Sequence, residues 1–241
     1  MKLRMGIAPF HVSLSFALVA TCLGQQSSSP SSGAQDKSIS NSESSTKIVR
    51  SDGSTITGSH YWNPYFGFSI ELPRGWMIAP QQEVEAMQKK NMKSLTKNDP
   101  EQVEEAARAR MVSAPPLVVI ENDPSKEGFE RRGFELLASD VSGEAGPLSG
   151  DAFLKAAAQL MREKSLPVEY LGVPEKVLIN GKTLWKAKLR ETTNGHVQYA
   201  RQYVAIVKKC AVQYLLVGPN DAGLEELESV IQTLHFSPSP N

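Results

Sequence analysis

Two Asn-Gly pairs in the last third of the chain constrain its fold more than any other feature. Asn180-Gly181 and Asn194-Gly195 each lie between runs in which apolar and polar residues alternate. Both central residues of a type I′ turn need a positive φ, so an Asn-Gly pair in this setting predicts a two-residue β-hairpin. Lys208-Lys209 separates two further apolar runs, 199–207 and 210–218. We therefore expect four antiparallel strands in succession.

Helices are expected before and after these strands. Ser149–Lys164 carries apolar residues at helical spacing, and Asn220 can cap a final helix with an apolar stripe. Two more helices are expected over 81–95 and 99–111, and short strands over 117–121 and 134–140. The strands are apolar on both faces. The sequence thus predicts an α+β fold, in which an antiparallel β-sheet has helices on both faces.

The segment Tyr61–Trp76, YWNPYFGFSIELPRGW, contains many of the aromatic residues of the chain. Phe66, Phe68, Ile70 and Leu72 alternate with smaller or polar residues, which predicts a strand with one buried face. Residues 73–75, Pro-Arg-Gly, predict a turn. Tyr61, Trp62 and Tyr65 lie at the edge of this strand. The sequence leaves two roles open for them, packing against the core or contact with a ligand.

The N-terminal region divides the chain into three parts. Residues 1–24 follow the charged, apolar and small-residue order of a secretory signal peptide, and residues 25–58 are a Ser-rich flexible tether. Residues 47–58 alternatively supply a short edge strand, and residues 59–238 form the domain. Cys22 offers a second interpretation, lipid attachment, and a retained anchor is a third. The expected location is exported, either periplasmic or extracellular, with no transmembrane segment in the mature chain.

Charge and cysteine content exclude several classes of protein. Lys and Arg together number 26, as do Asp and Glu, and this balance argues against a nucleic-acid binder. Removal of the signal peptide would leave Cys210 as the one remaining cysteine, so no intramolecular disulfide is expected. Cys210 lies in an apolar run, which indicates a buried, unreactive thiol.

Both ends of the domain resemble the PsbP-like superfamily. The resemblance is carried by YWNPYFGFSIELPRGW, and by the strand–Asn-Gly–strand–strand–helix order that runs to Leu234-His235-Phe236. It implies an α/β/α sandwich around an antiparallel sheet. It also implies a non-catalytic, accessory style of function, because the characterised relatives are photosystem II extrinsic subunits and a nuclear-import factor. The segment 81–110 is longer and more helical than in a minimal member.

Motifs for catalysis are absent from the sequence. The patterns G-x-S-x-G, G-x-x-x-x-G-K and H-E-x-x-H do not occur. His60, His196 and His235 lie far apart in the sequence, with no metal-ligand spacing. We therefore expect no enzyme activity, no cofactor and no metal.

One candidate binding face follows from the predicted hairpins. A two-residue turn at 194–195 makes Lys186 face Tyr203, Lys188 face Arg201, and Arg190 face Tyr199. A two-residue turn at 208–209 adds Tyr214 to the same face. Two directly opposed cations destabilise a strand pair unless something offsets them. An anionic or acidic partner would do so, and so would water or carboxylates from the final helix.

The sequence therefore predicts an exported accessory protein that binds an anionic or acidic partner of the cell envelope through this Lys/Arg/Tyr face. The alternative is a carrier of a small molecule or lipid between sheet and helices. A hydrolase with a dispersed site is the least favoured reading, because no nucleophile is paired with a base.

Overall fold

The computed structural model describes residues 47–86, 117–126, 128–142, 148–193 and 195–237. The signal segment, Cys22 and the helix expected over 99–111 lie outside the described residues. Of the helix expected over 81–95, residues 81–86 are described and are helical.

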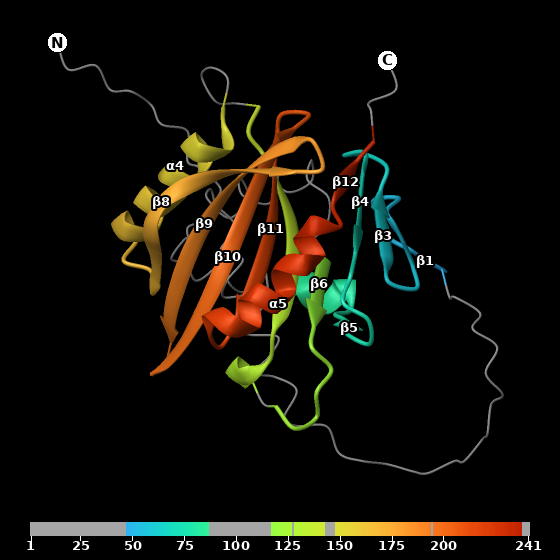
Figure 1. The fold of residues 1–241 in the computed structure, drawn as a ribbon, viewed down its shortest axis with the longest axis horizontal. Helices are drawn as coiled ribbons and strands as arrows, with labels where there is room; N and C mark the ends of the chain where they lie inside the picture. Colours follow the sequence, from blue (N-terminus) through green and yellow to red (C-terminus); the bar gives the residue numbers. More distant parts are fainter. Residues whose placement is uncertain (1–46, 87–116, 127, 143–147, 194, 238–241) are drawn as a thin grey trace.

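A seven-stranded antiparallel sheet forms the larger part of the described structure (Figure 1). Its spatial order is β5 (Met77–Ile78), β6 (Leu117–Ile120), β7 (Gly133–Asp140), β11 (Cys210–Gly218), β10 (His196–Val207), β9 (Lys182–Thr193) and β8 (Val168–Ile179). Strands β8 to β11 follow one another as antiparallel neighbours, which confirms the four expected strands.

Two-residue turns set the register of these strands. Asn180 and Gly181 have φ of 45° and 81°, and Lys208 and Lys209 have φ of 49° and 61°. All four therefore adopt the positive φ that a type I′ turn requires. For a lysine this conformation places Cβ close to the following carbonyl oxygen, at a cost of roughly 1–2 kcal/mol per residue.

A smaller five-stranded sheet joins the two ends of the described chain. Its order is β1 (Lys47–Val49), β2 (Thr55–Thr57), β3 (His60–Asn63), β4 (Phe68–Glu71) and β12 (His235–Phe236). Strand β1 pairs with β2, and β2 pairs with β3, so the folded part begins before residue 59, and residues 47–58 supply strands, as the alternative expectation had it.

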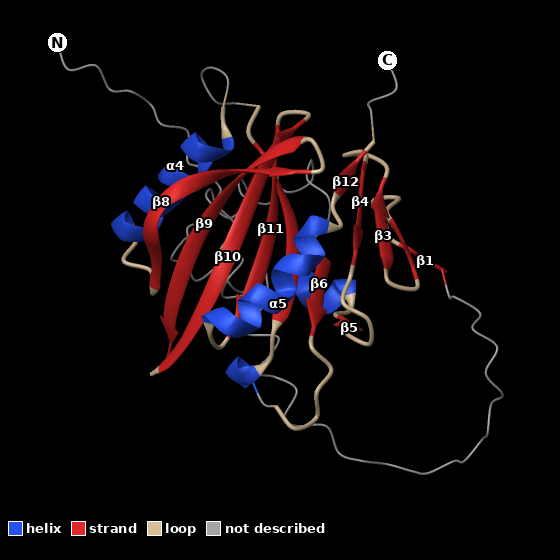
Figure 2. Cartoon of the chain, viewed as in Figure 1, coloured by secondary structure: helices blue, strands red, loops and turns tan. Residues whose placement is uncertain are grey.

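Helices are few among the described residues (Figure 2). Helix α4 (Gly150–Glu163) buries Phe153, Leu154 and Ala157 in a cluster with the β9 and β10 side chains of one sheet face. Helix α5 (Asp221–Gln232) packs against the other face, in a cluster shared with the smaller sheet, and a short 3₁₀ helix, η2, spans Gly128–Glu130. The predicted antiparallel sheet is confirmed, and the helical content of the described residues is small.

The aromatic segment 61–76 belongs mainly to the core. Phe66, Phe68, Ile70 and Leu72 are all buried, as predicted. Strand β4 begins only at Phe68, because the chain turns before it: the Asn63 side chain accepts a hydrogen bond from the Phe66 N–H, and Gly67 has φ of 67°. Tyr61 is also buried, whereas Tyr65 remains 47% exposed.

Candidate functional site

The strand register brings together the residues of the predicted binding face. Lys186 lies opposite Tyr203, Lys188 opposite Arg201, and Arg190 opposite Tyr199. Tyr203 in turn lies opposite Tyr214 on β11. Both sets of pairings agree with the predicted register, which depends on the two turns being two residues long.

Helix α5 covers the middle of this face and brings a carboxylate to it. Glu228 lies at the centre: its Oε1 is 2.6 Å from Lys186 Nζ and its Oε2 is 2.9 Å from Arg201 Nη1. The Tyr203 hydroxyl donates a hydrogen bond to the same carboxylate. Three side chains of the sheet therefore converge on one residue of the helix.

Arg201 is the most enclosed cation of the set, with 6% of its side chain exposed. Beyond Glu228 it lies 3.5 Å from a carboxylate oxygen of Asp221 and 3.8 Å from one of Glu225. These contacts offset the repulsion expected between Arg201 and Lys188. Of the alternatives raised by the sequence, which were a bound anion, water and carboxylates of the final helix, the structure shows helix carboxylates beside Arg201.

The electrostatics of Glu228 follow from these contacts. Burial, the largest single influence, would raise the pKa of its carboxyl group. Hydrogen bonds from Lys186, Tyr203 and Arg201 act in the opposite direction and together lower this pKa below its ordinary value. Burial, followed by its contact with the Glu228 carboxylate, raises the pKa of Tyr203, so its hydroxyl stays protonated. Tyr214 is fully buried in the core beneath α5 and does not reach the surface.

The face remains open at the end farther from the 208–209 turn. Lys188 is exposed, and no carboxylate of the described residues forms an ion pair with it. Arg190 Nη2 lies 2.6 Å from Glu169 Oε2, but both side chains are about half exposed. Tyr199, opposite Arg190, is half-buried. The accessible part of the predicted face is therefore Lys188, Arg190 and Tyr199, which we call the open end.

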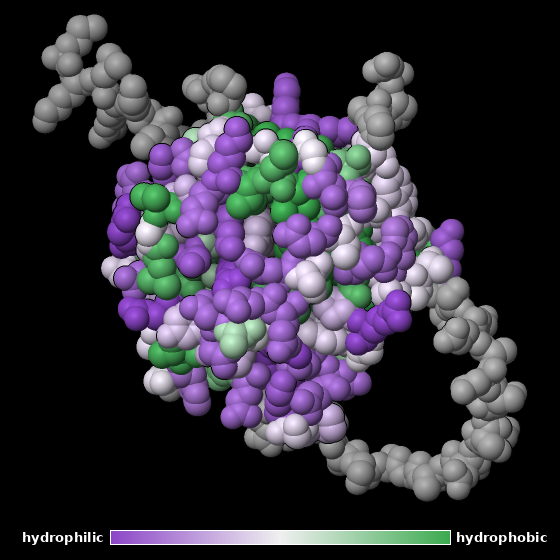
Figure 3. Space-filling view, viewed as in Figure 1, coloured by the Kyte–Doolittle hydropathy of each residue, from purple (hydrophilic) through white to green (hydrophobic). Residues whose placement is uncertain are grey.

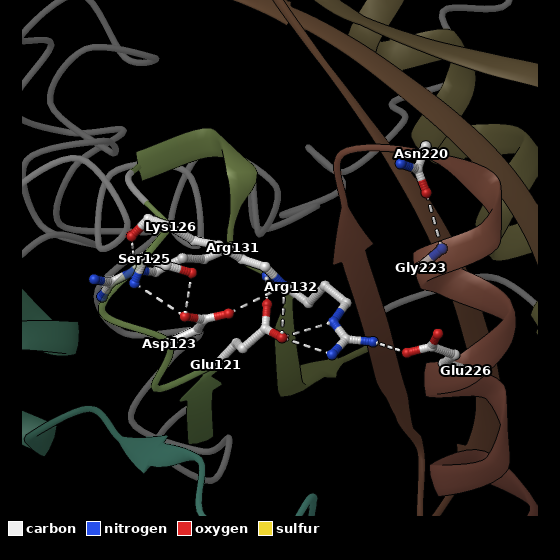
Figure 4. Close-up of polar contacts among 9 residues, drawn as sticks. All are labelled: Glu121, Asp123, Ser125, Lys126, Arg131, Arg132, Asn220, Gly223 and Glu226. Carbon is white, nitrogen blue, oxygen red and sulfur yellow. Dashed lines mark hydrogen bonds and ion pairs between the residues drawn. The ribbon is translucent and has the colours of Figure 1, made fainter.

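A second ionic network fastens the loop between β6 and β7 to α5 (Figure 4). Arg132 binds Glu121 Oε1 through Nε and Nη2, at 3.1 and 2.6 Å, and its Nη1 donates to Glu226 on α5. Its guanidinium also lies 5.7 Å from the centre of the Trp76 ring. Lys126 Nζ completes the network at 2.9 Å from Glu121 Oε1.

This network was not anticipated, because its members are scattered along the sequence. Glu121 follows a buried strand and Arg132 precedes the next one, which alone gives no sign of an ion pair. Burial acts most strongly on the pKa of Glu121, but contacts with Arg132 and Lys126 outweigh it and lower that pKa. Both ionic networks end on α5, so they hold the helix against the sheet.

The α4 face of the sheet contains a row of buried polar side chains. The Tyr170 hydroxyl donates to Gln202 Oε1 at 2.9 Å, Gln202 Nε2 to Gln213 Oε1 at 2.7 Å, and Gln213 Nε2 to Ser139 Oγ at 3.0 Å. Each amide side chain thus donates a hydrogen bond to the next polar side chain across the sheet, and buried amide groups need such partners. Glu191 is also buried on this face, and burial raises its pKa although Thr193 Oγ1 donates to it at 2.8 Å.

The histidines of the described region are not gathered into one site. His60 Nδ1 lies 2.7 Å from Glu71 Oε1, and Ser59 Oγ donates to the other oxygen of the same carboxylate at 2.9 Å. The carboxylate therefore separates the serine from the imidazole, whereas an activated serine needs direct contact with its base. His196 stacks on Phe129 with ring centres 4.8 Å apart.

Three further features limit the chemistry of the described region. Within it, no group of three or more His, Cys, Asp or Glu residues is placed to hold a metal ion. Cys210 is buried, and burial, together with the nearby Asp140 charge, raises the pKa of its thiol. None of the helices described is both long enough and apolar enough to cross a membrane.

Comparison with known proteins identifies similar solved structures but no family. No family model matches the chain, and no curated protein matches it in sequence. Cyanobacterial PsbP from Synechocystis is 10% identical, with a TM-score of 0.45 over 74% of this chain and 91% of its own. LpqN of Mycobacterium tuberculosis, which is involved in cell envelope biogenesis, is 14% identical, with a TM-score of 0.40 over 80% of this chain and 90% of its own. A Pseudomonas aeruginosa protein of unknown function is 19% identical, with a TM-score of 0.38 over 52% of this chain and 84% of its own.

Proposed function

We propose that this protein is an exported, non-catalytic accessory protein that binds an anionic or acidic partner of the cell envelope through its open end. The observation that carries the proposal is the state of Lys188. It is exposed and stands opposite Arg201, whose charge α5 already neutralises. Lys188 is therefore left as an exposed cation with no ion-pair partner among the described residues, and a bound anion would accept charge-assisted hydrogen bonds from it.

Arg190 and Tyr199 extend the same surface. Arg190 shares its charge with Glu169, and since both side chains are about half exposed, this contact contributes little stability and is easily exchanged for another carboxylate or phosphate. Tyr199 offers a hydroxyl donor beside the two cations. The partner class that suits these groups has several negative charges spaced along a surface, as an acidic polysaccharide or an acidic protein does.

The test compares retention on an immobilised cell-envelope extract. Lys188→Gln with Arg190→Gln is expected to abolish salt-sensitive retention while leaving the far-UV circular dichroism spectrum unchanged. Lys155→Gln on α4, with Lys164→Gln at its C-cap, removes the same charge elsewhere and should behave as wild type. Equal retention of both double variants would reject the proposal. Arg201 is unsuitable for substitution here, because its loss would also release α5.

The cell location and the architecture belong to the same proposal. We place the protein outside the cytoplasm, in the periplasm or beyond, because residues 1–24 have the composition of a secretory signal, with lipid attachment at Cys22 as the alternative form of export. Mass spectrometry of the N-terminus of the protein recovered from its host distinguishes the two.

For the fold we propose an α/β/α sandwich of PsbP type, supported by the antiparallel strands that lie between α4 and α5.

A further inference from the structure

A second cationic surface lies at another edge of the molecule, away from the open end. It consists of Lys182, Lys208, Lys209, Tyr65 and Phe236, and we call it the basic rim. Its residues come from the start of β9 next to the β8–β9 turn, from the β10–β11 turn, from the β3–β4 turn and from β12. Figure 1 places the β8–β9 turn, the β10–β11 turn and the end of β12 at the same edge of the molecule.

Aromatic contacts connect two sides of this rim through the buried rings of Phe66 and Phe68. Lys208 Nζ lies 5.1 Å from the centre of the Tyr65 ring, and Lys182 Nζ lies 5.2 Å from that of Phe236. Ring contacts then connect Tyr65 to Phe66 at 4.8 Å, Phe66 to Phe68 at 6.4 Å, and Phe68 to Phe236 at 5.7 Å. The two lysines therefore cap the two ends of one row of aromatic side chains.

The rim is held in place by hydrogen bonds to its turns. Asn180 Nδ2 donates to the carbonyl oxygens of Gln232 and Leu234, both at 2.9 Å, which fixes the β8–β9 turn beside β12. The Ser237 N–H donates to the Gly67 carbonyl at 2.8 Å, which fixes the β3–β4 turn beside the same strand. Two of the three turns are thus held beside β12, and the β10–β11 turn meets them through the contact of Lys208 with the Tyr65 ring.

The charge of the rim is not neutralised within the described residues. Lys182, Lys208 and Lys209 form no ion pair there. Asp140, which pairs with Cys210 next to the β10–β11 turn, instead accepts a hydrogen bond from the Ser142 N–H at 2.8 Å. Tyr65 adds an exposed aromatic ring, 47% of which reaches solvent.

The backbone of the β10–β11 turn gives an independent argument. Lys208 and Lys209 both hold φ in the left-handed region, where Asn and Gly are far less strained. The β8–β9 turn of the same sheet uses Asn-Gly for the same geometry. A lysine pair that is retained in this conformation despite its cost indicates a role for its two side chains.

We propose that the basic rim binds the surface of an anionic lipid bilayer. Lysines and an exposed tyrosine at the tips of turns suit that surface, because their apolar parts enter the headgroup region while the charges meet lipid phosphates. Each lysine near an anionic membrane strengthens binding by a factor of about five. The inference does not depend on the open end, since it rests on different residues.

The test measures binding of the full-length chain to vesicles. One set of vesicles contains phosphatidylcholine alone and the other contains phosphatidylcholine with phosphatidylglycerol. Since every variant has the same N-terminus, the difference in binding between the two vesicle sets isolates the electrostatic contribution. Wild type is expected to prefer the anionic vesicles and to lose this preference at high salt, which shortens the Debye length.

Lys208→Asn with Lys209→Gly is the decisive variant. It places the favoured turn residues in the β10–β11 turn, so its Tm should rise, while its binding to anionic vesicles falls about 25-fold. Lys208→Gln with Lys209→Gln should lose binding equally without the gain in Tm. Lys155→Gln with Lys164→Gln removes the same charge from α4 and its C-cap, and should bind as wild type.

Two results would overturn the inference. One is equal binding of wild type and the turn variants to anionic vesicles. The other is binding of wild type to polyglutamate, dependent on the same lysines, without any preference for anionic vesicles. The second result would assign the rim to an acidic protein instead.

Discussion

The contacts of Glu228 predict a large effect from a small chemical change. Glu228→Gln keeps the shape of the side chain but removes its charge. Among the described residues, Lys186 then has no carboxylate in contact and Arg201 keeps only its longer contacts. The exposed fractions of the three side chains are 25% for Glu228, 15% for Lys186 and 6% for Arg201. Breaking a fully buried pair costs about 3–5 kcal/mol and breaking an exposed one about 0–1 kcal/mol, so we expect a loss of about 2–3 kcal/mol.

The measurement is urea unfolding of both proteins at neutral pH, followed by circular dichroism. For a domain of this size the same loss lowers Tm by about 4–12 °C. Glu225→Gln is the matched control, because Glu225 lies on the same helix, 3.8 Å from Arg201, but its side chain is 73% exposed. It should cost less than about 1 kcal/mol.

The pH dependence of this difference has a definite sign. Since the folded state lowers the pKa of Glu228, its carboxylate stabilises the fold above the ordinary glutamate pKa. That stabilisation is lost as the pH falls through the lowered value. The gap between wild type and Glu228→Gln should therefore be widest at neutral pH and should close in acid. A gap that does not change with pH, or a control variant that is equally unstable, would refute the reasoning.

Three further predictions concern other parts of the structure. Gly150→Ala should destabilise the fold by about 1–3 kcal/mol, since the added Cβ would lie 2.8 Å from Trp185 Cδ1. Gly223→Ala should be neutral or stabilising, because only flexible side chains lie near its Cβ. Thermal unfolding of both variants measures the difference, and equal effects would contradict this prediction. Glu191→Gln should stabilise the protein at pH 8 and not at pH 4. The fold raises the pKa of Glu191, so the wild-type protein loses stability as the pH rises through that pKa and the buried carboxyl group ionises. Urea unfolding at both pH values checks this, and the opposite order would contradict it. Cys210 should resist a thiol reagent until the protein unfolds, as followed by peptide mass spectrometry, and rapid labelling of the native chain would contradict its burial.

Local sequence signals predicted the strands well, because the turns that join them are encoded by adjacent residues. Asn180-Gly181 fixes a two-residue turn, and a period of two then determines which side chains share a face. The pairing of Lys188 with Arg201 followed from that arithmetic alone. The caps of α4 and α5 are equally local, since Ser149 and Asn220 each accept a backbone hydrogen bond from the first turn of the helix.

The surroundings of those residues could not be predicted in the same way. Whether a carboxylate of α5 reaches Arg201 depends on where the helix lies across the sheet, and packing over the whole core decides that. Glu228 is one of several glutamates near the start of α5, and nothing in the sequence distinguishes it as the one that Lys186, Arg201 and Tyr203 share. The Arg132 network and the enclosure of Tyr214 escaped prediction for the same reason, as both depend on contacts between distant segments.

The pairing of β12 with β4 has a consequence for the kinetics of folding. The Glu71 N–H donates to the Thr233 hydroxyl across 162 positions of sequence, and His235 pairs with Ser69 beside it. At about 5–20 residues per second, a ribosome needs roughly 8–32 s to make the intervening chain. During that time the β3–β4 hairpin exposes an unpaired edge strand with no partner yet synthesised. Such delayed closure favours slow folding, and it keeps the nascent chain open to chaperones until β12 has been synthesised.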